Sequence, residues 1–349
     1  MKKYNIAVVG ATGMVGRKFL EVLEERNLPA GEYFLMASAR SAGKKVEFFG
    51  KQYTVEELNE NSFGPPKGDL KNILGGQKGG PRVDIALFSA GAGTSLKYAP
   101  IAAEAGTLVI DNSSAWRMDP SIPLVVPEVN PQDIEKNRGI IANPNCSTIQ
   151  AVVALKPLHD LYGIKRVVYS TYQAVSGAGL GGYRDLENGI NGDAPHKFPH
   201  PIFGNVIPHI DVFDESGYTK EEIKMARETQ KILGDDSIRV TATTVRVPVF
   251  NGHSESINIE FNKPYDLDEL KAALRSAPGV VVIDDPMKNE YPMPLSLAGR
   301  DEVFVGRIRR DDTVESGLNI WVVADNLRKG AATNAVQIAQ EWIRMQESK

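Results

Sequence analysis

The chain contains one cysteine, Cys146, whose surroundings suit it for chemistry. It stands in Asn143-Pro144-Asn145-Cys146-Ser147-Thr148, just before an apolar run from Ile149 to Leu161 that has the length of a helix. The dipole and first N–H groups of such a helix stabilise a thiolate, and free N–H groups there could hold an oxyanion. A lone cysteine is more often a buried core residue, but this context favours a nucleophile.

The helix alone gives a limited gain in reactivity. A thiol of pKa about 8.5 is only a few per cent ionised at neutral pH, so complete ionisation gains roughly tenfold to thirtyfold. Positioning, oxyanion stabilisation and proton transfer must supply the rest. A nucleophilic Cys146 therefore needs partners from elsewhere in the chain.

A histidine is the expected proton carrier, and the chain has five. His159 lies in the helix predicted after the cysteine and is interpreted as structural. His196, His200 and His209 resemble a metal cluster, but proline-rich loop histidines without cysteine or acid at ligand spacing seldom bind zinc, so no metal is predicted. His253 follows a charged strand-like segment and is the best candidate.

Arg246 opens that segment, Arg-Val-Pro-Val-Phe-Asn-Gly-His-Ser. It has two interpretations. It could form an ion pair at the surface, or it could bind a substrate carboxylate through two parallel hydrogen bonds.

Gly10, Gly13 and Gly16 lie between a short apolar run, Tyr4 to Val9, and a helical pattern from Arg17 to Glu25. Glycines at such a turn let a pyrophosphate approach backbone N–H groups at the positive end of a helix. The spacing is G-x-x-G-x-x-G rather than G-x-G-x-x-G, and a glycine turn can simply pack a helix on a sheet. Its place at the first turn of a βαβ pattern favours a nucleotide site.

The second predicted strand, 33–38, leads into Ser38-Ala39-Arg40-Ser41. NAD sites usually place an acid here for the ribose hydroxyls, whereas an arginine suits a 2′-phosphate. No acid lies between Phe34 and Val46. Arg40 could be a solvated surface residue, but the combination favours NADP.

A chain of 349 residues is expected to form two domains. In the first part, strand candidates at 84–88 and 107–111 flank a helix candidate at 96–104. This alternation predicts an α/β fold with a Rossmann-like, doubly wound parallel sheet. We expect the first domain to comprise residues 1–132 with 328–349, because the helix predicted at 331–344 should pack back on it.

The second domain is expected at 133–327. Its strand candidates, 166–172, 238–247 and 256–261, are longer and partly alternate polar with apolar residues. They predict an α+β catalytic and dimerisation domain with a mainly antiparallel sheet, covered on one face by helices such as 267–274.

Composition excludes several classes of protein. The net charge of -4, from 40 basic and 44 acidic residues without a basic stripe, indicates neither a nucleic-acid nor a membrane partner. One cysteine allows no internal disulfide and suits a reducing cytoplasm. The apolar run that ends at Val9 is too short for a signal or a membrane span. The Gly/Pro/Lys-rich composition of residues 64–81 predicts a loop, whose role is unknown.

With these residues in hand, the chain resembles the bacterial aspartate-semialdehyde dehydrogenase family over essentially its whole length. The motifs that carry the resemblance are Gly-Ala-Thr-Gly-Met-Val-Gly at 10–16, Ser-Ala-Gly at 89–91, Asn-Pro-Asn-Cys-Ser-Thr at 143–148, Ser-Thr-Tyr-Gln-Ala-Val-Ser-Gly-Ala-Gly at 170–179, the Arg246 to Ser254 segment, and Asp-Asn-Leu-Arg-Lys-Gly-Ala-Ala at 325–332. Together they are highly specific.

The resemblance implies roles for single residues. Cys146 would form an acyl-thioester, His253 would act as acid and base, and Gln173 would orient the substrate. The implied substrate-binding residues are Arg246 for the α-carboxylate, Glu221 for the α-amino group, Arg117 and Lys224 for phosphate, and Asn145. The implied cofactor-binding residues are Gly10, Thr12, Gly13, Met14, Val15, Ser38, Arg40, Ser41, Ser89, Ser176, Gly177 and Asn326. Without the resemblance, Glu221 and Lys224 would be interpreted as an exposed helix pair.

The implied reaction is the reversible, NADPH-dependent conversion of L-aspartyl-4-phosphate to L-aspartate 4-semialdehyde and phosphate, in lysine, methionine and threonine synthesis. A homodimer or homotetramer is implied. N-acetyl-γ-glutamyl-phosphate reductase is the nearest alternative, and a non-catalytic NADP-binding protein is another. A papain-like protease is excluded because no Cys-Gly-Ser-Cys-Trp type signature is present.

Overall fold

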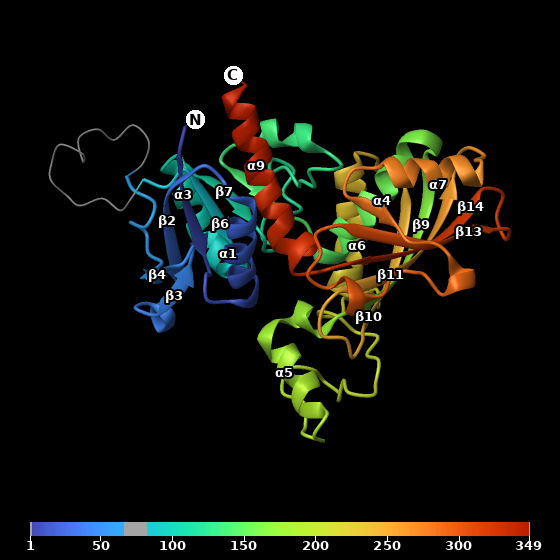
Figure 1. The fold of residues 1–349 in the computed structure, drawn as a ribbon, viewed down its shortest axis with the longest axis horizontal. Coiled ribbons are helices and arrows are strands. Elements are labelled where there is room, and N and C mark those ends of the chain that lie inside the picture. Colours follow the sequence, from blue (N-terminus) through green and yellow to red (C-terminus); the bar gives the residue numbers. More distant parts are fainter. Residues whose placement is uncertain (1, 66–81, 349) are drawn as a thin grey trace. The chain divides into compact units, whose positions relative to one another are not determined.

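The structure is a computed structural model that describes residues 2–65 and 82–348 (Figure 1). Most of the Gly/Pro/Lys-rich stretch at 64–81 therefore lies outside the described residues. The chain divides into two compact units, one of Met1–Pro144 with Ala331–Lys349 and the other of Asn145–Gly330. The predicted division after residue 132 falls before strand β8 (Ile140–Ala142), which pairs with β7 and thereby completes the sheet of the first unit.

The first unit contains a six-stranded sheet in the order β5-β2-β1-β6-β7-β8. All its neighbouring strands pair in parallel. Its other strands are β1 (Tyr4–Val9), β2 (Ala30–Ala37), β5 (Glu56–Glu57), β6 (Ile85–Phe88) and β7 (Leu108–Asp111). The central strand β6, and β1 apart from the partly buried Asn5, consist of apolar residues buried on both faces. The doubly wound parallel sheet predicted from the sequence is confirmed.

Among the residues that the structure describes, three helices of the first unit accompany this sheet: α1 (Met14–Arg26), α3 (Ala92–Glu104) and α9 (Thr333–Glu347). A small hairpin of β3 (Lys45–Phe48) and β4 (Lys51–Thr54) pairs separately. Helix α9 contacts α1, β6 and β7, so the end of the chain packs on the first unit as predicted.

The second unit contains a six-stranded sheet in the order β10-β9-β11-β14-β13-β12. Its strands are β9 (Ile164–Gln173), β10 (Arg239–Arg246), β11 (His253–Phe261), β12 (Val280–Val282), β13 (Val303–Asp311) and β14 (Gly317–Ala324). The central pairs β9–β11, β11–β14 and β13–β14 are antiparallel, and β10–β9 and β12–β13 are parallel. The mixed, mainly antiparallel sheet confirms the prediction.

Helix α4 (Cys146–Tyr162) contacts both α6 (Lys220–Leu233) and α7 (Leu267–Ser276), and all three contact this sheet. Figure 1 shows them beside the strands, with α5 (Gly179–Gly189) away from the sheet. The short helix α8 (Pro294–Leu297) follows β12 in the chain. Helix α6 begins with a capping box between Thr219 and Glu222 and ends at Gly234 in the left-handed conformation. Among the described residues, no helix is long and apolar enough to cross a membrane.

The strand directions bring the predicted catalytic residues to one edge of the second sheet. Parallel strands β9 and β10 end there with Gln173 opposite Arg246. The antiparallel strand β11 begins at the same edge, because Ser254 pairs with Tyr172. His253 therefore lies beside the ends of β9 and β10, although 80 residues separate it from Gln173 by position in the sequence.

Candidate active site

Cys146 is the first residue of α4, as the sequence predicts. Its Sγ lies 3.2 Å from Nε2 of His253, and its side chain is partly exposed. A thiol at a helix N-terminus, accessible to a small molecule and in contact with an imidazole, has the environment of a reactive cysteine.

Asn145 caps this helix. Its Oδ1 accepts hydrogen bonds from the N–H groups of Ser147 (2.9 Å) and Thr148 (3.2 Å). These two donors are therefore occupied, and the expectation of free helix N–H groups for an oxyanion is wrong at these positions. The cap instead fixes the start of the helix, and with it the direction of the Cys146 side chain.

His253 is fully buried at the start of β11. Its Nδ1 accepts a hydrogen bond of 3.0 Å from the N–H of Ala174, and its Nε2 faces the sulfur. Burial, together with the positive charge of Arg246, holds its pKa well below the ordinary value. The ring at Cys146 is therefore a neutral imidazole at physiological pH.

Arg246 is a buried cation rather than a surface ion-pair residue, because only 5% of its surface is exposed. Nη1 donates to the carbonyl of Ala174 (2.6 Å), and the guanidinium lies over the ring of Phe198. Its Nε has no hydrogen-bond partner among the described residues. Burial lowers its pKa, while Glu221 and Cys146 oppose that shift by attraction. A guanidinium buried with an unused donor is suited to bind an anion.

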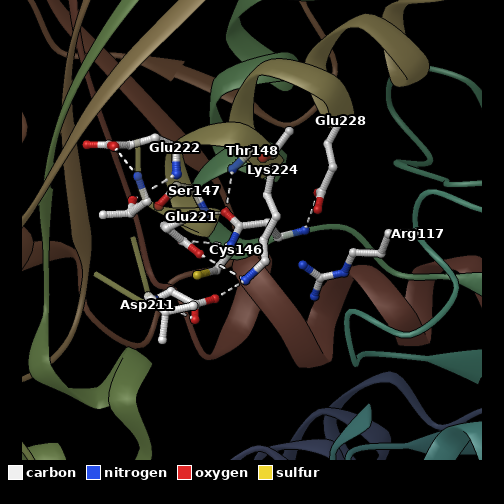
Figure 2. Close-up of polar contacts among 12 residues, drawn as sticks. Arg117, Cys146, Ser147, Thr148, Asp211, Glu221, Glu222, Lys224 and Glu228 are labelled. Carbon is white, nitrogen blue, oxygen red and sulfur yellow. Dashed lines mark hydrogen bonds and ion pairs between the residues drawn. The ribbon is translucent and has the colours of Figure 1, made fainter. Parts of the chain in front are cut away.

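Glu221 and Lys224, on the first turns of α6, do not form the exposed pair that their charges alone suggest. Glu221 is buried, and its Oε1 accepts from Nδ2 of Asn145 (2.8 Å) and from Nε2 of Gln173 (3.4 Å). Lys224 lies 3.6 Å from Glu221 and 2.6 Å from Asp211, as Figure 2 shows. A substrate ammonium would therefore join existing donors around Glu221 rather than meet a lone carboxylate.

Two residues of this site were missed in the sequence. Glu228 is fully buried and accepts a 2.7 Å hydrogen bond from the backbone N–H of Asn145. Asp211 holds Lys224: burial raises the pKa of Asp211, but the bond from Lys224 is among the causes that lower it overall. The spacing of Glu221, Lys224 and Glu228 on one helical face was a usable signal for Glu228. No pattern points to Asp211.

Gly330 is a further residue at the cysteine. A Cβ added there would lie 2.8 Å from Cβ of Cys146, too close for an ordinary contact. Gly177, one of the predicted cofactor residues, is constrained in the same way, since a Cβ would lie 2.9 Å from Nη1 of Arg246 and 3.2 Å from Cε1 of His253. Both glycines therefore allow the backbone to approach these side chains closely.

Ser176 and Asn326 are joined in the second unit. Nδ2 of Asn326 donates to Oγ of Ser176 (3.0 Å), and its Oδ1 accepts from the N–H of Gly252 (2.9 Å). The amide thus links the turn after β9 to the residue before His253. Whatever it binds, Asn326 also positions the start of β11.

The predicted phosphate residue Arg117 belongs to the first unit, and its side chain is buried. Nε donates to the carbonyl of Asn143 (3.0 Å) and Nη2 to that of Asn112 (2.9 Å). These bonds hold the guanidinium beside the segment that leads to the cysteine.

The glycine turn of the first unit fits a pyrophosphate. Gly10 has φ +86°, and a Cβ there would lie 2.8 Å from the carbonyl oxygen of Ser89, so only glycine is accommodated. Gly13 precedes α1 without any side-chain cap, and no acid lies in the first turn, where Met14 and Val15 are half-buried. The first turn of α1 therefore carries no carboxylate of its own that would compete for its N–H groups, which suits an anion site.

The end of β2 meets this turn. Oγ1 of Thr12 donates to Oγ of Ser41 (3.3 Å). Ser38, Arg40 and Ser41 form the following 3₁₀ turn and its N-cap, with Arg40 and Ser38 exposed and Ser41 buried. Hydroxyl groups and an exposed guanidinium lie where a ribose and its substituent would be expected.

The remaining histidines do not converge. His159 lies in α4, where its Nδ1 accepts from the N–H of Ile164 (3.2 Å), which supports its structural interpretation. Among the described residues, no three or more His, Cys, Asp or Glu side chains are grouped so as to hold a metal ion.

Comparison with known proteins agrees with this arrangement. Residues 5–137 match the family described as semialdehyde dehydrogenase, NAD binding domain, and residues 155–329 match semialdehyde dehydrogenase, dimerisation domain. The aspartate-semialdehyde dehydrogenase of Aquifex aeolicus is 60% identical over 97% of each chain.

Solved structures show the same likeness. Aspartate semialdehyde dehydrogenase II of Vibrio cholerae, complexed with ASA, superposes with a TM-score of 0.89 at 47% identity over 99% of each chain. The Candida albicans enzyme, with NADP, has a TM-score of 0.74 at 27% identity over 97% of this chain and 98% of that one. The chain has an NAD(P)-binding domain and a dimerisation domain, it is an oxidoreductase of amino-acid biosynthesis, and it belongs to the aspartate-semialdehyde dehydrogenase family.

Proposed function

We propose that this enzyme reduces L-aspartyl-4-phosphate to L-aspartate 4-semialdehyde with NADPH, and reverses the reaction in the presence of phosphate, through an acyl-thioester on Cys146. The observation that carries the proposal is the 3.2 Å contact of Cys146 Sγ with a buried, neutral His253, next to the buried cation Arg246. This pairing also argues against a non-catalytic nucleotide-binding protein, which has no need for it.

The side chains divide the work as follows. Cys146 attacks the C4 carbonyl carbon, and Gln173 orients that carbon beside the sulfur. Arg246 binds the α-carboxylate with its planar fork, and Glu221, supported by Asn145, attracts the α-ammonium. Lys224 and Arg117 attract the phosphate. Each charge of the substrate thus has an opposite charge in the protein.

The glycine turn would hold the cofactor, with the pyrophosphate on the first N–H groups of α1. Six of the proposed cofactor residues belong to this turn or face it: Gly10, Thr12, Gly13, Met14, Val15 and Ser89. The family resemblance implies three further contacts: Ser176, Gly177 and Asn326. Arg40, with Ser38 and Ser41, favours NADP over NAD because no acid stands in its place. When bound, the cofactor supplies the hydride.

We also propose that the enzyme works in the cytoplasm as a homodimer or homotetramer, and that its product feeds lysine, methionine and threonine synthesis. The single cysteine and the match to a dimerisation domain support these statements.

A phosphate-dependent assay tests the proposal. L-aspartate semialdehyde, NADP⁺ and phosphate should give NADPH absorbance, and omission of phosphate should stop turnover after the acyl-enzyme has formed. N-acetylglutamate semialdehyde, assayed in parallel, should react far more slowly, because it has no ammonium for Glu221 and is one methylene longer. Equal or faster reaction with that compound would assign the chain to the alternative substrate.

A further inference from the structure

A buried carboxylate on α5 holds a segment that follows this helix in the chain. Asp185 has only 4% of its surface exposed. Its Oδ1 accepts from the N–H of His196 (2.9 Å), and its Oδ2 accepts from the N–H groups of Lys197 (2.7 Å) and Phe198 (2.8 Å). Burial raises the pKa of Asp185, but these three bonds lower it overall, so the group is ionised at neutral pH. Three donors on one carboxylate fix the position and direction of backbone 196–198.

The same face of α5 also holds the ring of Phe198. This face consists of the three buried residues of the helix, Gly182, Asp185 and Leu186, whose spacing places them on one side. Gly182 leaves room for the ring, because a Cβ added there would lie 2.9 Å from Cζ of Phe198. Leu186 belongs to a small apolar cluster against which the ring packs. The helix therefore fixes both the backbone and the side chain of Phe198.

The ring of Phe198 in turn restrains the guanidinium of Arg246, which lies over it with Cζ 5.8 Å from the ring centroid. An aromatic face attracts a cation at this distance, and more strongly where water is excluded. Two further contacts hold the arginine. Its Nη1 donates to the carbonyl of Ala174 (2.6 Å), and its backbone exchanges two hydrogen bonds with that of Ile207 (2.8 and 2.9 Å). The segment after α5 thus contacts both the backbone and the side chain of Arg246.

These restraints bear on how Arg246 binds an anion. An arginine side chain has many rotamers, and fixing one of them at the moment of binding costs free energy. The ring and the carbonyl fix the guanidinium before a substrate arrives. The ring also takes the place of water on one face of the cation, which strengthens the attraction of the cation for a carboxylate.

We propose that Phe198 and Asp185 are positioning residues for substrate specificity: Phe198 holds the Arg246 guanidinium in the orientation that binds the α-carboxylate, and Asp185 holds Phe198. This inference rests on the proposed function, because it takes Arg246 as the ligand of the α-carboxylate. It adds that α5 and the segment after it contribute to recognition of the substrate through Arg246 alone.

Hydrogen exchange followed by mass spectrometry tests whether Asp185 holds the segment. In Asp185→Asn one acceptor atom becomes an N–H donor that faces a backbone donor. Amides of the peptide covering 196–198 should therefore exchange at least about tenfold faster. Glu187→Gln makes the same chemical change at an exposed position of the same helix and should leave the exchange unchanged. Equal exchange in Asp185→Asn and in the unmodified protein would show that Asp185 does not hold the segment.

Steady-state kinetics test the role of the ring. Phe198→Leu keeps an apolar side chain but removes the aromatic face. We expect kcat/KM for aspartate semialdehyde to fall by about 3- to 30-fold, mainly through KM, because the α-carboxylate is bound alike before and during the reaction. KM for NADP⁺ should not change. Phe203→Leu, at an exposed position after the same helix, is the matched control and should behave as the unmodified enzyme. Asp185→Asn should give a fall of the same kind.

A double-mutant cycle separates positioning of Arg246 from a general loss of structure. If Phe198 acts through Arg246, the effect of Phe198→Leu on kcat/KM should be largely lost in the Arg246→Lys background. Equal falls in both backgrounds, or a fall carried by kcat with KM unchanged, would overturn the proposal. Absence of phosphate-dependent turnover in the unmodified enzyme would instead refute the proposed function, and the exchange measurement would still decide whether Asp185 holds the segment.

Discussion

The glycine turn of the first unit depends on its backbone, whereas the cysteine site of the second unit depends on its side chains. In the turn, residues 10–16 act through their backbone, and Gly10 is required because a side chain would overlap Ser89. In the proposed cysteine site, Gln173, Arg246 and His253 would act through side chains at the ends of strands β9 to β11, and Cys146 would act from the start of α4.

This difference separates two kinds of sensitivity. In the proposed cofactor site, the turn would bind a pyrophosphate, which all dinucleotides share, and Arg40, outside the turn, would contact the part where the cofactors differ. The cysteine site buries charge and an unpaired donor at Arg246, and therefore depends on the chemical identity of each member. We therefore expect substitutions in the cysteine site of the second unit to lower turnover by a large factor. Substitutions in the first unit should change the choice of cofactor by a smaller factor.

Cys146→Ser should have the largest effect. The hydroxyl is a far weaker nucleophile and no other thiol is present, so kcat should fall by more than about 10³-fold. Binding of NADPH, measured by fluorescence titration, should be unchanged because the glycine turn is intact. Activity within tenfold of the unmodified enzyme would rule out the thioester.

Arg246→Lys should lower kcat/KM for aspartate semialdehyde by about 10- to 100-fold, since an ammonium cannot reproduce two parallel hydrogen bonds to a carboxylate. Arg239→Lys is the matched control, because Arg239 begins the same strand but is exposed. Steady-state kinetics of the two variants should differ clearly. Equal values would show that Arg246 is not a carboxylate ligand.

Arg40→Asp should reduce the preference for NADPH over NADH by about tenfold or more, because a carboxylate repels a 2′-phosphate and accepts hydrogen bonds from a ribose hydroxyl. Lys44→Asp makes the same change of charge at an exposed position nearby and should leave the ratio almost unchanged. The ratio of kcat/KM for the two cofactors is the measurement. A similar shift in both variants would indicate a general charge effect.

Glu255→Gln should have the smallest effect on kcat, but it should measurably change the free energy of unfolding. Glu255 lies on β11 two residues after His253, fully buried, and neither carboxylate oxygen has a partner among the described residues. Burial, and secondarily Glu221, raises its pKa well above the ordinary value. The folded protein thus holds a proton that the unfolded chain releases above about pH 4.5.

A raised pKa fixes the direction in which the contribution of Glu255 to the free energy of unfolding changes with pH. The contribution of Glu255 is fully present below the unfolded pKa and is lost as pH rises towards the folded pKa, by up to about 1.4 kcal/mol per pH unit. The free energy of unfolding can be measured with denaturant between about pH 5 and 8, which is roughly the range above the unfolded pKa. As pH rises over this range, the glutamine variant should become more stable relative to the unmodified protein. Glu260→Gln is the control: the bond from Lys165 lowers the pKa of Glu260, so its contribution is lost as pH falls. Parallel pH curves for unmodified protein and Glu255→Gln would refute a protonated Glu255.

Both sheets could be predicted from the sequence because their strands carry strong local signals, such as the apolar run of β1. Cys146 at a helix start and the glycine turn were local as well. Pairing Cys146 with His253 required a choice among five histidines, which the segment after Arg246 supported and the strand register now explains.

Other features depend on tertiary contacts and left no local pattern. Asn145 could be seen as a helix cap, but its use of two N–H donors depends on its rotamer. The burial of Glu221, the bond between Asp211 and Lys224, and the approach of Ala174 to His253 arise only when α6, β9 and β11 pack together. Charged residues on a helix look alike in sequence whether they face solvent or a site.

The central claim is a covalent intermediate on Cys146. Enzyme mixed with L-aspartate semialdehyde and NADP⁺ without phosphate, then quenched in acid, can be examined by intact-protein and peptide mass spectrometry. We expect a mass increase of one aspartyl acyl group on the peptide that contains Cys146, its disappearance when phosphate is added before the quench, and no adduct in Cys146→Ser. Turnover with no adduct at Cys146, or an adduct that phosphate does not remove, would contradict the central claim.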